Sequence, residues 1–87
     1  MLIMNQRETA FIDSSTFGLY SITKESPGYL VGAYNAKNTD PVRLGWYIEK
    51  DEAQEALFEL YDAINRGDDS FCMPQRVRES VVNSQIY

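Results

Sequence analysis

The chain has 87 residues, a hydrophobic fraction of 44% and a formal net charge of −5, from 13 acidic and 8 basic side chains. This length fits a single domain, residues 1–87, with a modest core, and the hydrophobic fraction is too high for a disordered chain. The acidic balance argues against direct nucleic-acid binding, which depends on neutralising phosphates. The acidic balance is compatible with binding to a basic protein partner.

The cysteine content and the amino terminus bear on location. The single Cys72 cannot form an internal disulfide, which favours a reducing compartment, and we expect its side chain to be a small buried hydrophobe. The apolar start is only four residues long, Met1 to Met4, which is too short for a signal peptide or a membrane span. We therefore expect a cytoplasmic protein without a membrane segment.

The first half of the chain reads as short strands separated by polar turns. In chain order, the expected strands are Leu2–Met4, Thr9–Ile12, Phe17–Lys24, Tyr29–Tyr34 and Val42–Ile48. Ser26-Pro27-Gly28 separates the third strand from the fourth, and since proline presets φ while glycine accepts positive φ, we expect a hairpin there. The series predicts an antiparallel β-meander of four to five short strands.

One amphipathic helix is predicted from about Lys50 to Asn65. Its apolar residues recur at spacings of three and four and therefore share one face; they are Ala53, Ala56, Leu57, Leu60, Tyr61 and Ile64. Acidic residues crowd the first turns, where the helix dipole favours negative charge, and Gly67 is a natural terminating residue. Such a helix packs on one face of the meander, so the predicted fold class is α+β. The tail at 75–87 is expected to add a short helix or strand.

Part of this pattern resembles a group of small proteins from phages and prophages of Gram-positive bacteria. The resemblance rests on Gly45-x-Tyr47, Glu52-Ala53, Leu57-x-x-Leu60, Ala63-Ile64, Gly67 and Phe71-x-Met73-Pro74, and it begins at the short strand and polar turn Leu2-Ile3-Met4-Asn5-Gln6. Members commonly have Ser or Thr as the helix N-cap, where this chain has Glu49 and Lys50. These proteins have no established enzymatic activity, so the resemblance implies an origin in a mobile element rather than a mechanism.

The residue types argue against catalysis. The chain has no histidine, which removes the usual base at neutral pH and the commonest metal ligand. One cysteine without histidine excludes a thiol–imidazole pair. The sequence has neither a nucleophile elbow nor a phosphate-binding glycine loop, and the glycines at 28 and 32 belong to a strand pattern. We expect a protein that is not an enzyme and that has no metal or cofactor.

The expected helix carries an acidic face and an aromatic residue beside it. Five acidic side chains fall within about a third of the helix circumference; they are Asp51, Glu52, Glu55, Glu59 and Asp62. This face either imitates nucleic-acid charge toward a basic effector or, as is more usual, only faces water. Phe58 lies about 100° from Leu57, beside the acidic face. It is either an anchor for a partner or for self-association, or a single exposed apolar residue.

Arginines and aromatic residues together suggest a ligand site. The candidate ligand-binding residues are Arg43, Trp46, Tyr47, Arg76 and Arg78. In such a site a ring stacks on a base while an arginine binds a phosphate through two hydrogen bonds. In a small homo-oligomer the pocket could form between subunits. The alternative is that the strand aromatics are core residues or cross-strand pairs.

Three classes of function are compatible with these features. The first, slightly favoured, is a phage counter-defence protein that sequesters a small nucleotide immune signal in the infected host cell. The second is an acidic, anti-CRISPR-like inhibitor that blocks a nucleic-acid-binding defence protein. The third is a structural or regulatory phage accessory protein without a ligand.

Overall fold

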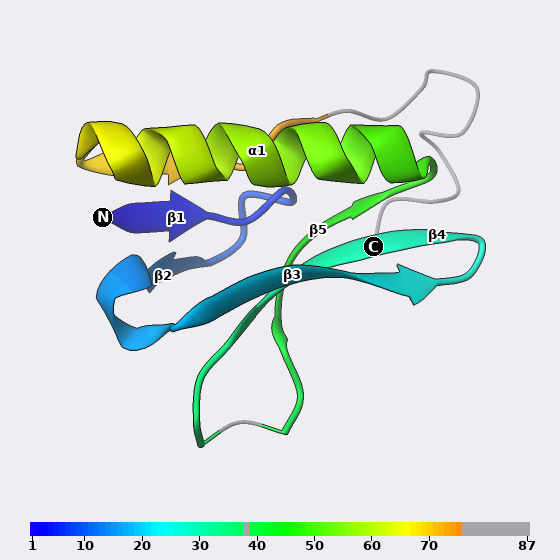
Figure 1. The fold of residues 1–87 in the computed structure, drawn as a ribbon, viewed down its shortest axis with the longest axis horizontal. Helices are drawn as coiled ribbons and strands as arrows, with labels where there is room; N and C mark the ends of the chain where they lie inside the picture. Colours follow the sequence, from blue (N-terminus) through cyan, green and yellow to red (C-terminus); the bar gives the residue numbers. More distant parts are fainter. Residues whose placement is uncertain (38, 76–87) are drawn as a thin grey trace.

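The computed structural model describes residues 1–37 and 39–75, which form two three-stranded sheets and one long helix (Figure 1). The elements, in chain order, are β1 (Leu2–Met4), β2 (Phe11–Asp13), the short 3-10 helix η1 (Ser14–Thr16), β3 (Leu19–Glu25), β4 (Gly28–Tyr34), β5 (Val42–Tyr47), α1 (Lys50–Arg66) and β6 (Ser70–Cys72). Helix α1 packs against β3, β4, β5 and β6. The α+β class and the strand-rich first half with one amphipathic helix are confirmed.

The first sheet has the strand order β2-β1-β6. β1 and β2 are antiparallel, as expected for a hairpin, with Ile3 opposite Ile12. The Asn5 side chain organises the turn, because its Oδ1 accepts hydrogen bonds from the backbone N–H groups of Thr9 at 2.9 Å and Ala10 at 3.3 Å. β6 pairs with β1 in parallel. The chain that follows the helix therefore returns beside the amino terminus, a pairing that the predicted meander lacks.

The second sheet has the order β3-β4-β5 with antiparallel neighbours. The β3–β4 hairpin forms around the predicted turn, and its strands are shifted by one or two residues from the predicted bounds. One face of β4 carries Val31 and Ala33, which belong to the core cluster that includes α1 residues. Leu30 and its cross-strand partner Trp46 lie on the other face, because successive side chains alternate.

The register between β4 and β5 contains an irregularity that matters for the site. Val31 is opposite Gly45, but the next residue, Gly32, is opposite Arg43, so Leu44 is an extra residue on β5. Leu44 is fully buried and belongs to the core cluster. A β-bulge of this kind shifts the alternation of the strand. Arg43 therefore shares a face with Trp46, whereas strict alternation would place the two on opposite faces.

Helix α1 begins without a side-chain cap and ends at a glycine. Glu49 precedes the helix in an extended conformation and its side chain makes no capping hydrogen bond. Gly67 has φ 77°, in the left-handed region that glycine tolerates, and its N–H donates to the carbonyl of Ile64. The core-facing residues are mostly alanines, which let the helix approach the sheets closely; the buried set is Ala53, Ala56, Leu60 and Ala63.

Three expectations need correction or fall outside the structure. Tyr61 and Ile64, predicted on the core face of the helix, are 60% and 42% exposed. The helix packs against the sheets mainly through its buried alanines, and Tyr61 and Ile64 lie at the edge of that contact. Cys72 is exposed on the outer strand β6 rather than buried. The predicted tail element lies almost wholly outside the described residues, which end at 75. In the described part of the chain, no helix is long and apolar enough to cross a membrane.

Candidate functional site

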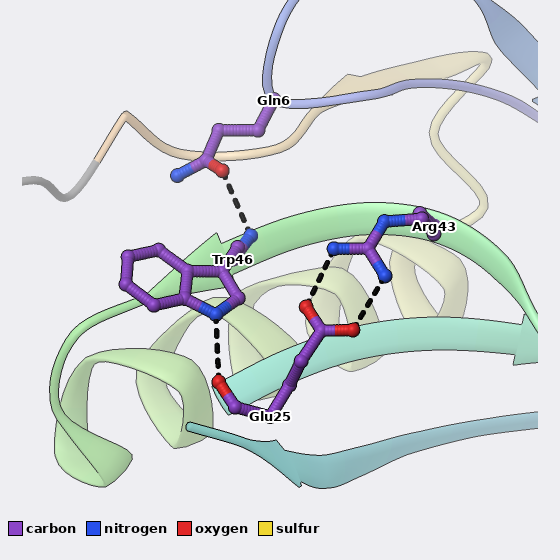
Figure 2. A network of polar contacts seen from close by, with 4 residues as sticks. All are labelled: Gln6, Glu25, Arg43 and Trp46. Atoms are coloured by element: carbon purple, nitrogen blue, oxygen red, sulfur yellow. Dashed lines mark hydrogen bonds and ion pairs between the residues drawn. The ribbon is translucent and has the colours of Figure 1, made fainter. Parts of the chain in front are cut away.

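The β3-β4-β5 sheet presents a paired arginine on its face away from α1 (Figure 2). The guanidinium of Arg43, on β5, donates from Nη1 and Nη2 to the two carboxylate oxygens of Glu25, on β3, both at 2.6 Å. Both side chains are 40% exposed. Two parallel hydrogen bonds fix the plane of the guanidinium, which is the geometry that suits carboxylate and phosphate groups.

The ion pair keeps Glu25 ionised. The hydrogen bonds from Arg43 lower the pKa of the Glu25 carboxyl from its ordinary value, slight burial opposes this shift, and the positive charge of Arg43 supports it. A carboxyl whose pKa is lower in the folded state stabilises the fold above its ordinary pKa, and this contribution is lost as the pH falls through the lowered value. The pair is therefore formed throughout the neutral range.

Trp46 supports this pair from the side and is itself part of the core. Its indole Nε1 donates to the backbone carbonyl of Glu25 at 3.1 Å, and its side chain leaves the residue only 5% exposed. The ring lies against Gly28, where a Cβ atom would stand 2.4 Å from Trp46 Cζ2. Trp46 therefore holds the end of β3 in place, and its ring has no open face on which a base could stack.

A buried glutamine connects the turn of the first sheet to the outer edge of β5. Gln6 is 2% exposed; its backbone N–H donates to the carbonyl of Leu44 at 2.7 Å, and its Oε1 accepts from the N–H of Trp46 at 2.8 Å. Its Nε2 donates to the carbonyl of Pro74 at 3.5 Å. The same carbonyl accepts the hydroxyl of Tyr47 at 2.8 Å. These contacts join both sheets and the end of the described chain.

The predicted ligand-binding residues are thus only partly brought together. Arg43 and Trp46 meet around Glu25, as Figure 2 shows. Tyr47 is fully buried on the opposite face, within the core cluster. Trp46 and Tyr47 are therefore both buried core residues, which is the alternative that the sequence left open. Arg76 and Arg78 lie outside the described residues. Sequence reasoning missed Glu25 and Gln6, because one is a charged residue beside a turn and the other a polar residue within a turn.

The predicted partner-binding residues are all on α1. Asp51, Glu55 and Phe58 are exposed, and the other three are partly buried: Glu52, Glu59 and Asp62. Phe58 is 63% exposed and its ring stacks on that of Tyr61, with the centroids 6.0 Å apart and the planes at 20°.

An apolar groove lies between α1 and the outer strand β3, and we call it the α1–β3 groove. Its volume is about 670 Å³, and it is lined by Tyr20, Ile22, Gln54, Leu57, Phe58, Leu60, Tyr61 and Ile64. Its lining is uncharged, and two of its aromatic rings are the stacked and exposed Phe58 and Tyr61. Of the residues that line it, the sequence indicated only Phe58 as a possible contact residue.

Within residues 1–37 and 39–75, no three acidic, histidine or cysteine side chains are placed to hold a metal ion. No family model matches the chain, and neither a curated protein nor a solved structure matches it.

Proposed function

We propose that this chain is a phage-encoded binding protein, not an enzyme, that counters bacterial immunity by sequestering a small nucleotide signal in the cytoplasm of the infected cell. The observation that supports it best is the half-exposed Arg43, whose guanidinium is held flat by two hydrogen bonds to Glu25. A phosphate offers two oxygens in the same arrangement as a carboxylate. A nucleotide phosphate would take the place of the Glu25 carboxylate on an arginine that is already oriented.

The chemistry around Arg43 favours binding over turnover. The chain has no histidine, Arg43 is paired with an ionised carboxylate, and the indole of Trp46 bonds to the backbone of the same glutamate. Hydrolysis or transfer would need a nucleophile or base with a positioned partner. A protein that binds the signal tightly and leaves it intact lowers its free concentration, which is sufficient for counter-defence.

In the described part of the chain, neither Trp46 nor Tyr47 offers an open ring to the base of the ligand, because both are buried. We therefore include a homo-oligomer in the proposal, with a second subunit closing the site over Arg43. An oligomer also gives a small chain additional burial, which a domain of this size lacks.

Arg43→Ala is expected to weaken nucleotide capture about 10- to 100-fold, since charged hydrogen bonds contribute about 1.5–3 kcal/mol. Glu25→Gln is expected to tighten capture, because the competing carboxylate is removed and the fold keeps an isosteric side chain. Both are measured as retained nucleotide in native mass spectrometry and by titration calorimetry.

Arg66→Ala is the matched control for Arg43→Ala. Arg66 also pairs with a carboxylate, at 2.8 Å from Asp68 Oδ2, but it lies at the end of α1, so the same charge is removed away from the site. Wild-type capture by Arg43→Ala, or an equal loss in Arg66→Ala, would remove Arg43 from the ligand site.

A second candidate function is an inhibitor that binds a basic defence protein through α1. It is favoured by the gathering of acidic side chains on one part of the helix surface, with Asp51 and Glu55 exposed. Such a surface attracts a nucleic-acid-binding effector electrostatically.

Replacing Glu55 and Glu59 together by Lys is expected to abolish inhibition of such an effector, with the unfolding temperature little changed because neither side chain is in the core cluster. Inhibition of nucleic-acid cleavage by purified effectors is the measurement. Asp40→Lys with Asp69→Lys makes the same change of charge at exposed positions off the helix. Full inhibition by the helix variant, or equal loss in both, would count against this function.

A further inference from the structure

The outer edge of β3 is open. β3 is a seven-residue strand at the end of the order β3-β4-β5, and in the described part of the chain no strand pairs with its free side. The opposite edge of the same sheet is occupied, because Gln6 bonds to the backbone of Leu44 and Trp46. An open edge presents unpaired N–H and C=O groups over a length of about 23 Å, at about 3.3 Å per residue, and can pair with another strand.

The α1–β3 groove runs beside this open edge. Tyr20 and Ile22 of β3 form one wall, and the helix contributes the stacked rings of Phe58 and Tyr61 to the other side. These two rings are 63% and 60% exposed, which leaves roughly 200–300 Å² of aromatic surface in contact with water, from side chains of about 150–250 Å² each. A contiguous apolar patch next to an open strand edge indicates a contact surface, unlike single exposed apolar residues scattered over a protein.

The charge distribution on α1 indicates which kind of partner can bind at the α1–β3 groove. At about 100° per residue, the groove-facing residues and the five acidic residues occupy separate sectors of the helix. The groove-facing sector carries Gln54, Leu57, Phe58, Tyr61 and Ile64 and no acid. Two copies of a chain with net charge −5 repel each other over most of their surface. The uncharged sector is where a second acidic copy can approach, and it offers nothing to a basic partner.

We propose that the occupant is a second copy of this chain, related by a two-fold axis. The two β3 strands would pair in antiparallel register and join the β3-β4-β5 sheets into one continuous sheet. The two α1 helices would then lie on the same face, antiparallel, with Phe58 and Tyr61 of each copy packed along the seam. A two-fold axis makes the same surface complementary to itself, and antiparallel helices place opposite dipole ends together. This inference rests on the oligomeric part of the proposed function, but it names a different contact from the one over Arg43, because the seam lies along β3 whereas Arg43 lies on β5, on the face away from α1.

Native mass spectrometry and light scattering of the ligand-free protein test this pairing. An assembly with an even number of 10.0 kDa chains is expected. Phe58→Glu and Tyr61→Lys place charges of opposite sign on the seam, and each is expected to raise the dissociation constant of the dimer at least tenfold. The β3 amides that point away from β4 should exchange slowly with solvent in the wild type and faster in both variants.

Phe11→Glu is the matched control, because Phe11 is 61% exposed on β2, in the other sheet, and it should leave the dimer intact. A monomeric wild type, or the same dimer in both seam variants, would overturn the inference, as would equal dissociation in Phe11→Glu. A ligand-free dimer that captures no nucleotide would support this pairing while counting against sequestration.

Discussion

Substituting Gly28 by Ala is expected to destabilise the protein by about 3 kcal/mol, at the upper end of the usual cost of overpacking. A Cβ atom at Gly28 would lie 2.4 Å from both Trp46 Cζ2 and the backbone carbonyl oxygen of Tyr47. The carbonyl belongs to a paired strand and cannot move aside without breaking the β4–β5 ladder. Urea unfolding followed by the fluorescence of Trp46 measures the loss.

Gly18→Ala is the control for this substitution, because a Cβ atom there meets nothing within 4 Å. It is expected to change the free energy of unfolding by less than about 0.5 kcal/mol, as is usual at surface positions. Equal stability of Gly28→Ala and Gly18→Ala would contradict the packing of Trp46 over the start of β4. Because Trp46 also holds the backbone of Glu25, Gly28→Ala should in addition loosen the Arg43–Glu25 pair.

Gln6→Leu is expected to cost about 2–3 kcal/mol. The substitution keeps the approximate size of the side chain but removes the Oε1 that accepts the N–H of Trp46. Gln6 is buried, so the released N–H cannot reach water, and an unsatisfied buried donor costs about 1–3 kcal/mol. The carbonyl of Pro74 loses the Gln6 amide but still accepts a hydrogen bond from the Tyr47 hydroxyl, so it adds little to the loss of stability. Urea unfolding again measures the effect.

Thr39→Leu likewise replaces a polar side chain by leucine, at an exposed position between β4 and β5 and away from the α1–β3 groove, and it is expected to leave the free energy of unfolding within about 0.5 kcal/mol of the wild type. If Gln6→Leu were as stable as Thr39→Leu, Gln6 would not be the residue that joins the turn of the first sheet to β5.

The helix and the β3–β4 hairpin were predictable because their signals are local. Apolar spacing and Gly67 define the helix, and a proline–glycine turn defines the hairpin. β6 was missed as a strand because it has three residues and its partner, β1, is far away in the sequence. The division into two sheets was missed for the same reason, since it depends on which distant strands pair.

The candidate site was only partly predictable. Arg43 and Trp46 were identified by residue type, but their meeting on one face depends on the bulge at Leu44, which a strictly alternating pattern does not contain. The Trp46 ring packs over Gly28 of β4 and the Tyr47 ring over Gly45 of its own strand, which a linear pattern does not reveal. Glu25 could be found only once the β3-β4-β5 order was known, because its partner Arg43 is 18 positions away in the sequence.

The most direct test of nucleotide sequestration is native mass spectrometry of the wild-type protein, mixed with extracts of bacteria whose nucleotide-signalling immunity has been triggered. An assembly of defined subunit number is expected to gain a nucleotide-sized mass that Arg43→Ala does not gain. An unchanged mass across extracts from several immune systems would contradict sequestration, and it would favour the acidic inhibitor or the accessory protein.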